Sequence, residues 1–234
     1  MSTHTKTYKY LEKRPSKEVI EQFYTVSTCM VSDALDKLGL PAGIHGIRPM
    51  YPGCKKVCGP AVTMKIMPYG PKNPEGHMGA DPLFVAEPGD VLVFDNSGRL
   101  DQNCWGDITT CSAMQKGIAG TIIDGASRDI GEIEDFGYPL YARGATPLTA
   151  RGRNVQSDYN CQIQLGGVQV NPGDIVMADV NGVVVVPQDR VEDVLQAALE
   201  ICARETAIVE ELKAGISFAE VDEKSGYDKM LEKK

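Results

Sequence analysis

The chain has 234 residues, of which 42% are hydrophobic and 24% charged, and its formal net charge is −8 at pH 7. This length is enough for one sizeable domain with its own core. The negative charge argues against a broad nucleic-acid interface, which needs a basic face. No apolar run approaches the roughly 20 residues of a membrane-spanning helix, so neither nucleic acid nor a membrane is an expected partner.

The amino-terminal stretch is polar and lacks the apolar segment of a signal peptide. Seven cysteines are scattered through apolar segments, which indicates free, mostly buried thiols. Both features predict a protein of the cytoplasm.

The first elements in chain order are helical. Residues 16–39 are expected to form helix, with Ser16 as N-cap, a break near Ser27 and Thr28, and Gly39 as terminator. Residues 57–67 read as a strand, and a loop rich in glycine and proline follows at 69–81. Two Pro-Gly-Asp turns, at 88–90 and 172–174, each lead into an apolar strand, but their flanks differ too much to indicate duplication.

The middle of the chain alternates helix and strand. Residues 106–117 are predicted to be helical and to lead into a strand at 119–124. Ser127 would then cap a new helix that begins at Arg128.

The last part begins with an apolar strand at 183–186 and continues with the longest predicted helix, 189–213, capped by Asp189 and closed by Gly215. The mixture of helices and strands predicts one α/β domain over residues 1–234. Its core would cover about 16–190, and the helix at about 189–214 would lie at a subunit interface.

Polar residues follow the strand at 119–124, where a helix is predicted to start. In α/β folds the carboxyl ends of strands and the amino ends of helices bind ligands, and a helix start favours an anion. Arg128 offers a planar fork for a carboxylate, and Asp129 offers oxygen to a hard cation such as Mg2+. A salt-bridged helix start, with Ser127 as cap and Arg128 paired to Glu132, fits the same spacing.

Two further signals lie outside this stretch. Gly106 permits close backbone approach and Asp107 begins a helix, so both helix starts could face one pocket, although Asp107 could also be a plain N-cap. Glu205 falls within the apolar stripe of the last helix, where an unpaired carboxylate is costly. Glu205 would face a polar pocket or meet a cation of another subunit. It could also lie near the edge of a shorter buried face, or form a salt bridge.

The spacing of Asp107, Arg128-Asp129 and Glu132 resembles the D-x20-R-D-x2-[ED] signature of the RraA-like family. The stretches STCMVSDALDKLG, IRPMYPGCKKVCGPAVTMK, EPGDVLVFD, WGDITT and NPGDIVMADVNGVVVVP agree with it. The resemblance implies a swivelling β/β/α sandwich and trimers or hexamers with sites between subunits. It also implies a class II pyruvate aldolase, such as 4-hydroxy-4-methyl-2-oxoglutarate or 4-carboxy-4-hydroxy-2-oxoadipate aldolase, with Mg2+ or Mn2+.

On this resemblance, Asp129 would be the direct protein ligand of the metal and Asp107 would hold a metal-bound water. Arg128 would bind the keto oxygen and carboxylate of the substrate and stabilise the enolate. Gly106 and the backbone N–H groups of Ile108 and Thr109 would bind the pyruvoyl carboxylate.

Two glutamates complete the implied site. Glu205 of a neighbouring subunit would reach the metal through water, and Glu132 would support Arg128 or the helix start. Retro-aldol cleavage of a 4-hydroxy-2-oxo di- or tricarboxylic acid would release pyruvate and a second oxo acid, and oxaloacetate decarboxylation passes through the same enolate. The base would be a water or hydroxide held by Asp107 and the metal, because no histidine is near in sequence. Lys116 lies too far along its helix to form a Schiff base.

The chain departs from the family in the loop that contains His77, so the substrate stays open. His77 could contact a distal carboxylate of the substrate, or could be a plain surface-loop histidine. Arg151, Arg153 and Asn154 could make the same contact. The alternative function is a non-catalytic RraA-type regulator that acts on an RNA-degrading endonuclease by protein contact, because some relatives resemble such inhibitors. A methyltransferase is disfavoured, because no Gly-rich adenosyl-methionine loop is apparent.

Overall fold

The computed structural model describes residues 7–74 and 76–226. The helices are α1 (Lys17–Phe23), α2 (Thr28–Lys37), α3 (Ala80–Val85), α4 (Asp107–Gln115), α5 (Ile130–Phe136), α6 (Val191–Lys213) and α7 (Phe218–Ser225), with a short 3-10 turn, η1 (Gln188–Arg190). The strands are β1 (Arg48–Pro49), β2 (Val57–Pro68), β3 (Val91–Asn103), β4 (Gly120–Ser127), β5 (Leu140–Ala142), β6 (Gly144–Ala145), β7 (Asn154–Tyr159), β8 (Ile163–Leu165), β9 (Val168–Val170), β10 (Ile175–Asp179) and β11 (Gly182–Val186).

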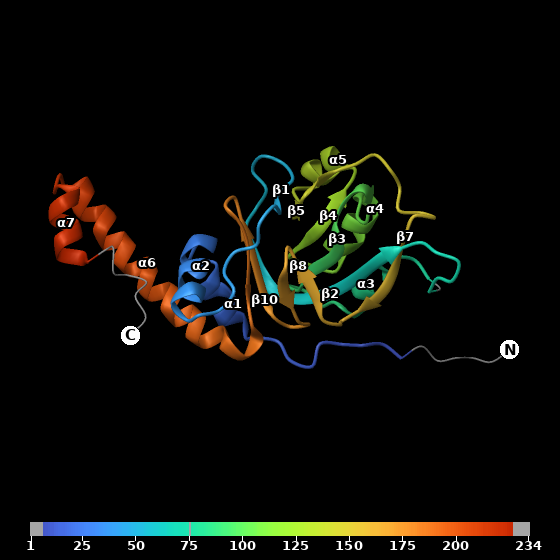
Figure 1. Cartoon of the computed structure of the whole chain (residues 1–234), viewed down its shortest axis with the longest axis horizontal. Coiled ribbons are helices and arrows are strands. Elements are labelled where there is room, and N and C mark those ends of the chain that lie inside the picture. The colour runs from blue at the N-terminus through green and yellow to red at the C-terminus, as the bar shows by residue number, and fades with distance from the viewer. Residues whose placement is uncertain (1–6, 75, 227–234) are drawn as a thin grey trace.

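One mixed sheet forms the centre of the molecule, in the order β1-β5-β4-β3-β2-β10-β11 (Figure 1). Strands β2, β3, β4 and β5 run parallel, whereas β10 and β11 are antiparallel to their neighbours. Strand β7 pairs with β2, β6 pairs with β4, and β8 and β9 form a separate hairpin. All eight residues of β4 are buried, as expected of a parallel strand covered on both faces.

Alternate side chains of the central strands enter different cores. On β3, Val91 and Val93 point to an inner core that also contains Val176 of β10 and the β8–β9 hairpin. Leu92 and Phe94 point to an outer core with Ile133 of α5. Because β10 shares the inner core with the parallel strands, the sheet curls almost closed around it. Helices α1, α2 and α6 cover the outside of β10 and β11.

The predicted fold class, a sandwich-type α/β domain with an extended C-terminal helix, is confirmed. The helix break falls where expected, with Ser16 and Ser27 as the N-caps of α1 and α2. The C-terminal half of α6 and α7 project away from the sheet (Figure 1). Whether this arm lies at a subunit interface stays a prediction.

Three local predictions were wrong. Ser127 caps no helix: it is the last residue of β4, and its hydroxyl donates to the carbonyl of Trp105 at 3.0 Å. Asp189 lies within η1, and Arg190 is the N-cap residue of α6. The cysteines are all free, but only Cys58 and Cys104 are buried. Three others are half-buried against the edges of the cores, and Cys29 and Cys111 are exposed.

Within residues 7–74 and 76–226, none of the helices combines the length and apolar character needed to cross a membrane.

Candidate active site at the starts of α4 and α5

The ends of β3 and β4 are joined by backbone hydrogen bonds just before their helices begin. The amide of Cys104 donates to the carbonyl of Ala126 at 3.2 Å, and the amide of Arg128 donates to the carbonyl of Trp105 at 3.1 Å. The two segments that carry Asp107 and Asp129 are therefore held side by side by main-chain contacts.

Trp105 fixes the first turn of α4. Its side chain is 2% exposed, its Nε1 donates to Oγ1 of Thr110 at 2.8 Å, and its ring packs edge-on against Phe94 with centroids 5.4 Å apart. A buried indole with its N–H satisfied is a stable anchor. This contact orients the start of α4 toward the carboxyl edge of the sheet.

Glycine is required at position 106 because the Asp129 side chain packs closely against it, and not because of its backbone conformation. Its backbone is extended, with φ −156° and ψ −170°, which any residue can adopt. A Cβ at this position would lie 2.5 Å from Oδ2 of Asp129 and 3.5 Å from the Arg128 side chain. Any larger residue would push the Asp129 carboxylate out of place.

Asp129 adopts a left-handed backbone conformation, with φ 57° and ψ 41°. Its Oδ2 accepts hydrogen bonds from Nε of Arg128 at 3.1 Å and from the amide of Asp107 at 3.3 Å. Left-handed non-glycine residues cost on the order of 1 kcal/mol or more and cluster at functional sites. The strained backbone aims this carboxylate at the guanidinium and at the start of α4.

The first turn of α4 presents amide groups to the same space. The amide of Ile108 donates to Oδ1 of Asp107 at 2.7 Å, and Oγ1 of Thr109 bonds to Gly106. The amide of Thr109 has no acceptor among the described residues. A substrate carboxylate could accept a hydrogen bond from the amide of Thr109 directly. It could accept a second one from the amide of Ile108 if it displaced the Asp107 side chain.

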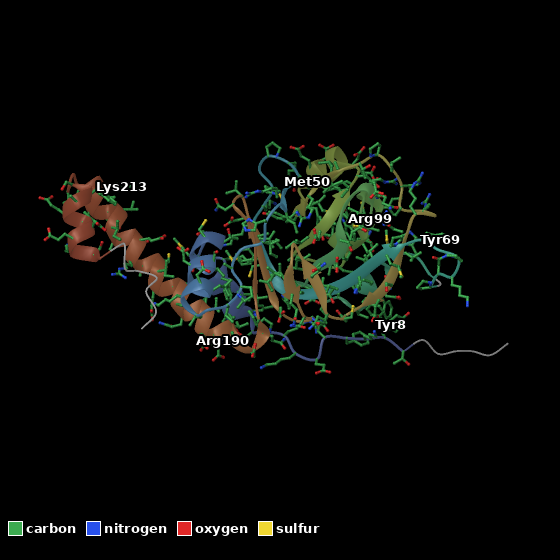
Figure 2. The ribbon with its side chains drawn as sticks, in the orientation of Figure 1. Tyr8, Met50, Tyr69, Arg99, Arg190 and Lys213 are labelled. Carbon is green, nitrogen blue, oxygen red and sulfur yellow. The ribbon has the colours of Figure 1, made fainter. Side chains whose placement is uncertain are left out.

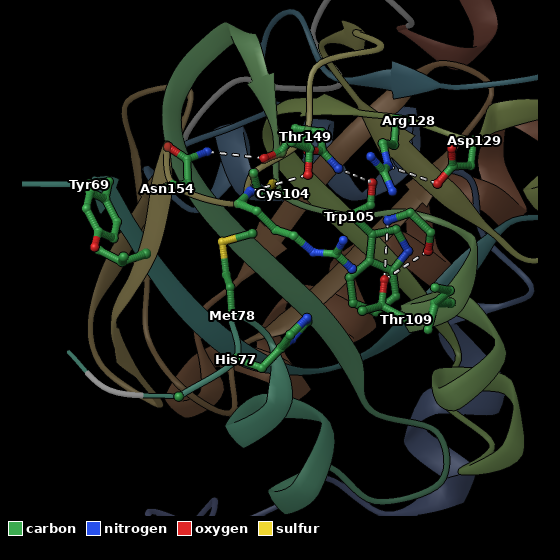
Figure 3. A pocket seen from close by; sticks show the side chains of 18 of the residues that line it. Tyr69, His77, Met78, Cys104, Trp105, Thr109, Arg128, Asp129, Thr149 and Asn154 are labelled. Atoms are coloured by element: carbon green, nitrogen blue, oxygen red, sulfur yellow. Dashed lines mark hydrogen bonds and ion pairs between the residues drawn. The ribbon is translucent and has the colours of Figure 1, made fainter. Parts of the chain in front are cut away.

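These groups line one cavity of about 370 Å3, shown in Figure 3. Its wall includes Gly106, Asp107, Ile108, Thr109, Arg128 and Asp129. The side chains of Arg128 and Asp129 are 32% and 29% exposed, so they are open to a ligand but partly shielded from water. Six residues that were predicted from the sequence as substrate or metal contacts thus meet in one place.

The two glutamates and the lysine lie elsewhere. Glu132 is exposed in the first turn of α5, and Arg128 pairs with Asp129 instead of with Glu132. Nζ of Lys116 donates to the carbonyls of Leu83 and Phe84, both at 2.7 Å, away from the cavity.

Glu205 lines a second cavity between α6 and α7. Desolvation, followed by the nearby Asp33 charge, raises the pKa of its carboxyl group above the usual range. Lys213 at the end of α6 and Tyr69 at the site cavity lie at opposite ends of the molecule (Figure 2), so Glu205 does not join the site of its own chain. A role in a neighbouring subunit's site stays a prediction.

Some members of the cavity, among them Cys104, Thr149 and Val155, were not named from the sequence, although each lies close to a residue that was. The 69–81 loop and the polar segment with Arg151 and Asn154 were marked as candidate pocket walls, and both line the cavity. Arg153 does not, because its guanidinium donates to the carbonyl of Thr149.

The residues fit a hard divalent cation. No group of three or more His, Cys, Asp or Glu side chains arranged for a metal occurs in the part of the chain that the structure describes. Mg2+ needs fewer protein ligands, because it keeps several waters and binds through one or two carboxylates. Asp129, with Asp107 beside it at the start of α4, supplies this kind of donor set.

The fold and site define a class of α/β protein in which a curled sheet carries a cavity with Asp107, Arg128 and Asp129 at the carboxyl ends of its strands. Comparison with known proteins identifies the family within this class. The model of the RraA-like family, described as Aldolase/RraA, matches residues 28–185, and the chain belongs to this family. A protein of Halalkalibacterium halodurans with the provisional name 4-hydroxy-4-methyl-2-oxoglutarate aldolase is 33% identical over 207 residues, 87% of this chain and 94% of that protein.

Two other relatives differ in length and description. Protein DlpA of Legionella pneumophila is 31% identical over 218 residues, which cover 93% of this chain but only 35% of DlpA. The solved structure of Streptomyces coelicolor RraAS2, described as an unusual member of the RNase ES inhibitor RraA protein family, superposes with a TM-score of 0.75. It is 31% identical and covers 83% of this chain and 96% of its own.

Proposed function

We propose that the protein is a divalent-metal-dependent lyase that cleaves 4-hydroxy-2-oxo acids to pyruvate and a second oxo acid, with oxaloacetate decarboxylation as a side activity. The observation that carries this proposal is the meeting, in one cavity, of Arg128, Asp129 and Asp107 with the amide of Thr109, which no described residue accepts from. The provisional name of the H. halodurans relative supports the same reaction class.

The pyruvoyl end of the substrate would bind at the start of α4. Its carboxylate accepts hydrogen bonds from the amides of Thr109 and Ile108, where the helix dipole favours an anion. Its keto oxygen lies against the Arg128 guanidinium, which Asp129 holds in place through Nε. When bound, a Mg2+ or Mn2+ ion held by Asp129, with Asp107 on one of its waters, supplies Lewis-acid stabilisation of the developing oxyanion.

Cleavage begins with removal of the 4-hydroxyl proton and continues with the breaking of the C3–C4 bond. A water oriented by Asp107 accepts the proton of the 4-hydroxyl group, and the C4 oxygen becomes an oxo group as the C3–C4 bond breaks. The electron pair of that bond forms the C2–C3 double bond, and the π pair of the keto group moves to its oxygen beside Arg128, which gives the enolate of pyruvate. The water that took the 4-hydroxyl proton returns it to C3 and completes pyruvate. No lysine lines the cavity in the described part of the chain, which supports a route without a Schiff base.

Pyruvate release, coupled to lactate dehydrogenase, tests the proposal with 4-hydroxy-2-oxo acids and oxaloacetate, each with Mg2+, Mn2+ or EDTA. We expect release with metal and none with EDTA. No release from any substrate by metal-replete protein would refute the lyase.

The alternative is a non-catalytic regulator that contacts an RNA-degrading endonuclease, and the similarity to RraAS2 favours it. A pull-down with such an endonuclease tests it separately. Binding that survives Arg128→Ala, in a protein that releases no pyruvate, would support the regulator over the lyase.

A further inference from the structure

The backbone carbonyl of Trp105, at the start of α4, accepts three hydrogen bonds. The amide of Arg128 donates to it at 3.1 Å, Oγ of Ser127 at 3.0 Å, and Nδ2 of Asn103 at 3.2 Å. A carbonyl oxygen has two lone pairs, so three donors saturate this acceptor and fix its direction. Because the same peptide group continues into Gly106, its orientation determines where the first turn of α4 lies.

A chain of side-chain amides leads to this carbonyl. Nη1 of Arg99 donates to Oδ1 of Asn154 at 3.3 Å, and Nδ2 of Asn154 donates to the backbone carbonyl of Asn103 at 3.2 Å (Figure 3). Asn103 is the last residue of β3 and Asn154 is the first residue of β7, and they are 6% and 5% exposed. Hydrogen bonds in such buried surroundings are stronger than on the surface. The chain therefore ties β7 to the start of α4.

The polar atoms of the two asparagines are not directed to a substrate, although both residues line the cavity. Both ends of the Asn154 amide are engaged. Nδ2 of Asn103 donates to Trp105, whereas its Oδ1 is buried and has no hydrogen-bond partner among the described residues. A buried acceptor without a partner is unfavourable, so packing alone would favour an aliphatic side chain at position 103. The donor to Trp105 is the feature that only the asparagine supplies.

The Trp105 carbonyl lies where the two halves of the candidate site meet. On one side, the first turn of α4 carries the amide of Thr109 and the carboxylate of Asp107. On the other side, the guanidinium of Arg128 follows β4, and the amide of the same residue donates to the Trp105 carbonyl. A shift of this carbonyl would change the distance between the carboxylate-binding amide and the guanidinium. A misplacement of about 1 Å in an active site can cost on the order of a hundredfold in rate.

We propose that Asn103 and Asn154 are positioning residues of the lyase. They do not touch the substrate, and they act through the Trp105 carbonyl, which they hold so that the first turn of α4 stays in register with Arg128. This inference rests on the proposed function and adds two residues that set the geometry of its site. Asn154 also follows the cavity wall at residues 149–153, so the chain links that wall to the start of α4.

Single and double alanine variants test whether the two asparagines act as one chain. Asn103→Ala should lower kcat/KM for pyruvate release about tenfold, and Asn154→Ala about threefold, since each loses one buried hydrogen bond to the chain. Because Asn154 acts through Asn103, the double variant should be no more impaired than Asn103→Ala. Losses that multiply to about thirtyfold in the double variant would show two independent effects and refute the chain.

Asn103→Leu separates positioning from packing. Leucine fills the space and removes the buried Oδ1, so thermal unfolding should show a more stable protein than Asn103→Ala. It has no donor for the Trp105 carbonyl, so its kcat/KM should stay about tenfold below wild type. Recovery of turnover together with stability would mean that position 103 needs only volume, and would refute the proposal.

Thr121→Val is the matched control. Oγ1 of Thr121 is buried and lies 2.9 Å from the hydroxyl oxygen of Tyr138, near the opposite end of β4 from Arg128. The variant loses a buried hydrogen bond away from the site, so it should lose stability but keep kcat/KM within about twofold. If it slows turnover as much as Asn103→Ala, the effect is general destabilisation and the proposal is wrong.

Hydrogen exchange separates the chain from the lyase, because it needs no substrate. Mass spectrometry would follow the segments that contain the amides of Thr110 and Arg128, which donate to the carbonyls of Gly106 and Trp105. Both should exchange about twofold to tenfold faster in Asn103→Ala, and at the wild-type rate in Thr121→Val.

The two readouts fail separately. Unchanged exchange in Asn103→Ala, or faster exchange with normal kcat/KM, would refute the positioning role and leave the lyase standing. If wild type releases no pyruvate but Asn103→Ala exchanges faster at both segments, the lyase is wrong and the chain that holds the start of α4 stands.

Discussion

Nε of Arg128 lies 3.1 Å from Oδ2 of Asp129, the next residue in the chain, and that same oxygen accepts from the amide of Asp107 at 3.3 Å. One carboxylate therefore links the guanidinium after β4 to the first turn of the helix after β3. The proposed chemistry depends on this link, because it sets the position of the cation and of the oxyanion-binding amides together.

Gly106→Ala should disrupt the link with little effect on the fold. The new Cβ would meet Oδ2 of Asp129 at 2.5 Å, so the carboxylate must move. We expect kcat to fall about a hundredfold, the cost of a misplacement of about 1 Å in an active site. Gly131→Ala in α5 is the control, because its Cβ would meet nothing within 4 Å. Equal activity of the two variants would show that close packing at Gly106 is not needed for turnover.

Arg128→Lys keeps the charge but removes the planar fork. The ammonium of lysine cannot hold Asp129 through Nε and contact the keto oxygen at once. We expect kcat to fall on the order of a hundredfold to a thousandfold, as when an oxyanion donor is removed. Arg190→Lys, at an arginine that pairs with Asp193 on α6, is the control. Steady-state pyruvate release measures both variants, and near-normal turnover of Arg128→Lys would argue against the role given to the guanidinium.

Mixing experiments test whether Glu205 serves a neighbouring subunit. Arg128→Ala and Glu205→Gln should each be impaired alone. If every site combines Arg128 of one subunit with Glu205 of the next, random mixing of the two variants restores about a quarter of the sites. Co-purified hybrids should therefore regain activity. Hybrids as impaired as their parents would contradict a role for Glu205 in the neighbouring subunit's site.

The pH dependence of stability should report on Asp179. Burial alone would raise the pKa of this carboxyl group, but hydrogen bonds from Thr28 and Asn181 outweigh burial and lower it. Because the folded-state pKa is the lower one, the stabilisation is present above the unfolded value of about 3.9 and is lost as the pH falls through the folded value.

Asp179→Asn should lower the free energy of unfolding by about 1–2 kcal/mol at pH 7. The difference from wild type should shrink as the pH falls below about 4. Urea unfolding at a series of pH values measures it, with exposed Glu223→Gln as the control. A difference that does not depend on pH would mean that the charge of Asp179 is not involved.

The helices and strands that carry the site were located correctly from the sequence, whereas the residues at which they begin and end were predicted less well. Apolar periodicity and Pro-Gly turns located β2, β3, α4 and β10, because these features are local. The length of β4 was underestimated, since Asp124 looks like the end of a strand. Asp124 in fact remains in the sheet, because Arg143 and the amide of Gly166 satisfy its buried carboxylate. Those partners are far apart in sequence, so no local pattern could indicate them.

Only part of the candidate site could be predicted, because some of its features are local in sequence and others depend on tertiary packing. Arg128 and Asp129 are adjacent in the chain, and the spacing to Asp107 follows from one strand between two helices. The 2.5 Å approach that requires Gly106, and the left-handed backbone of Asp129, depend on how β3 and β4 pack together. Cavity residues such as Tyr69 and Thr149 come from separate connections, and only the tertiary structure brings them to the site.

The most direct test of the account is pyruvate release by wild type and Asp129→Asn, measured against Mg2+ concentration. Asparagine tolerates the left-handed backbone of position 129 and keeps the size of the side chain, so the fold should persist while the charge is lost. The account predicts saturable, Mg2+-dependent release by wild type that EDTA abolishes, and almost none by Asp129→Asn at any Mg2+ concentration. Equal release by both proteins, or release that is insensitive to EDTA, would contradict it.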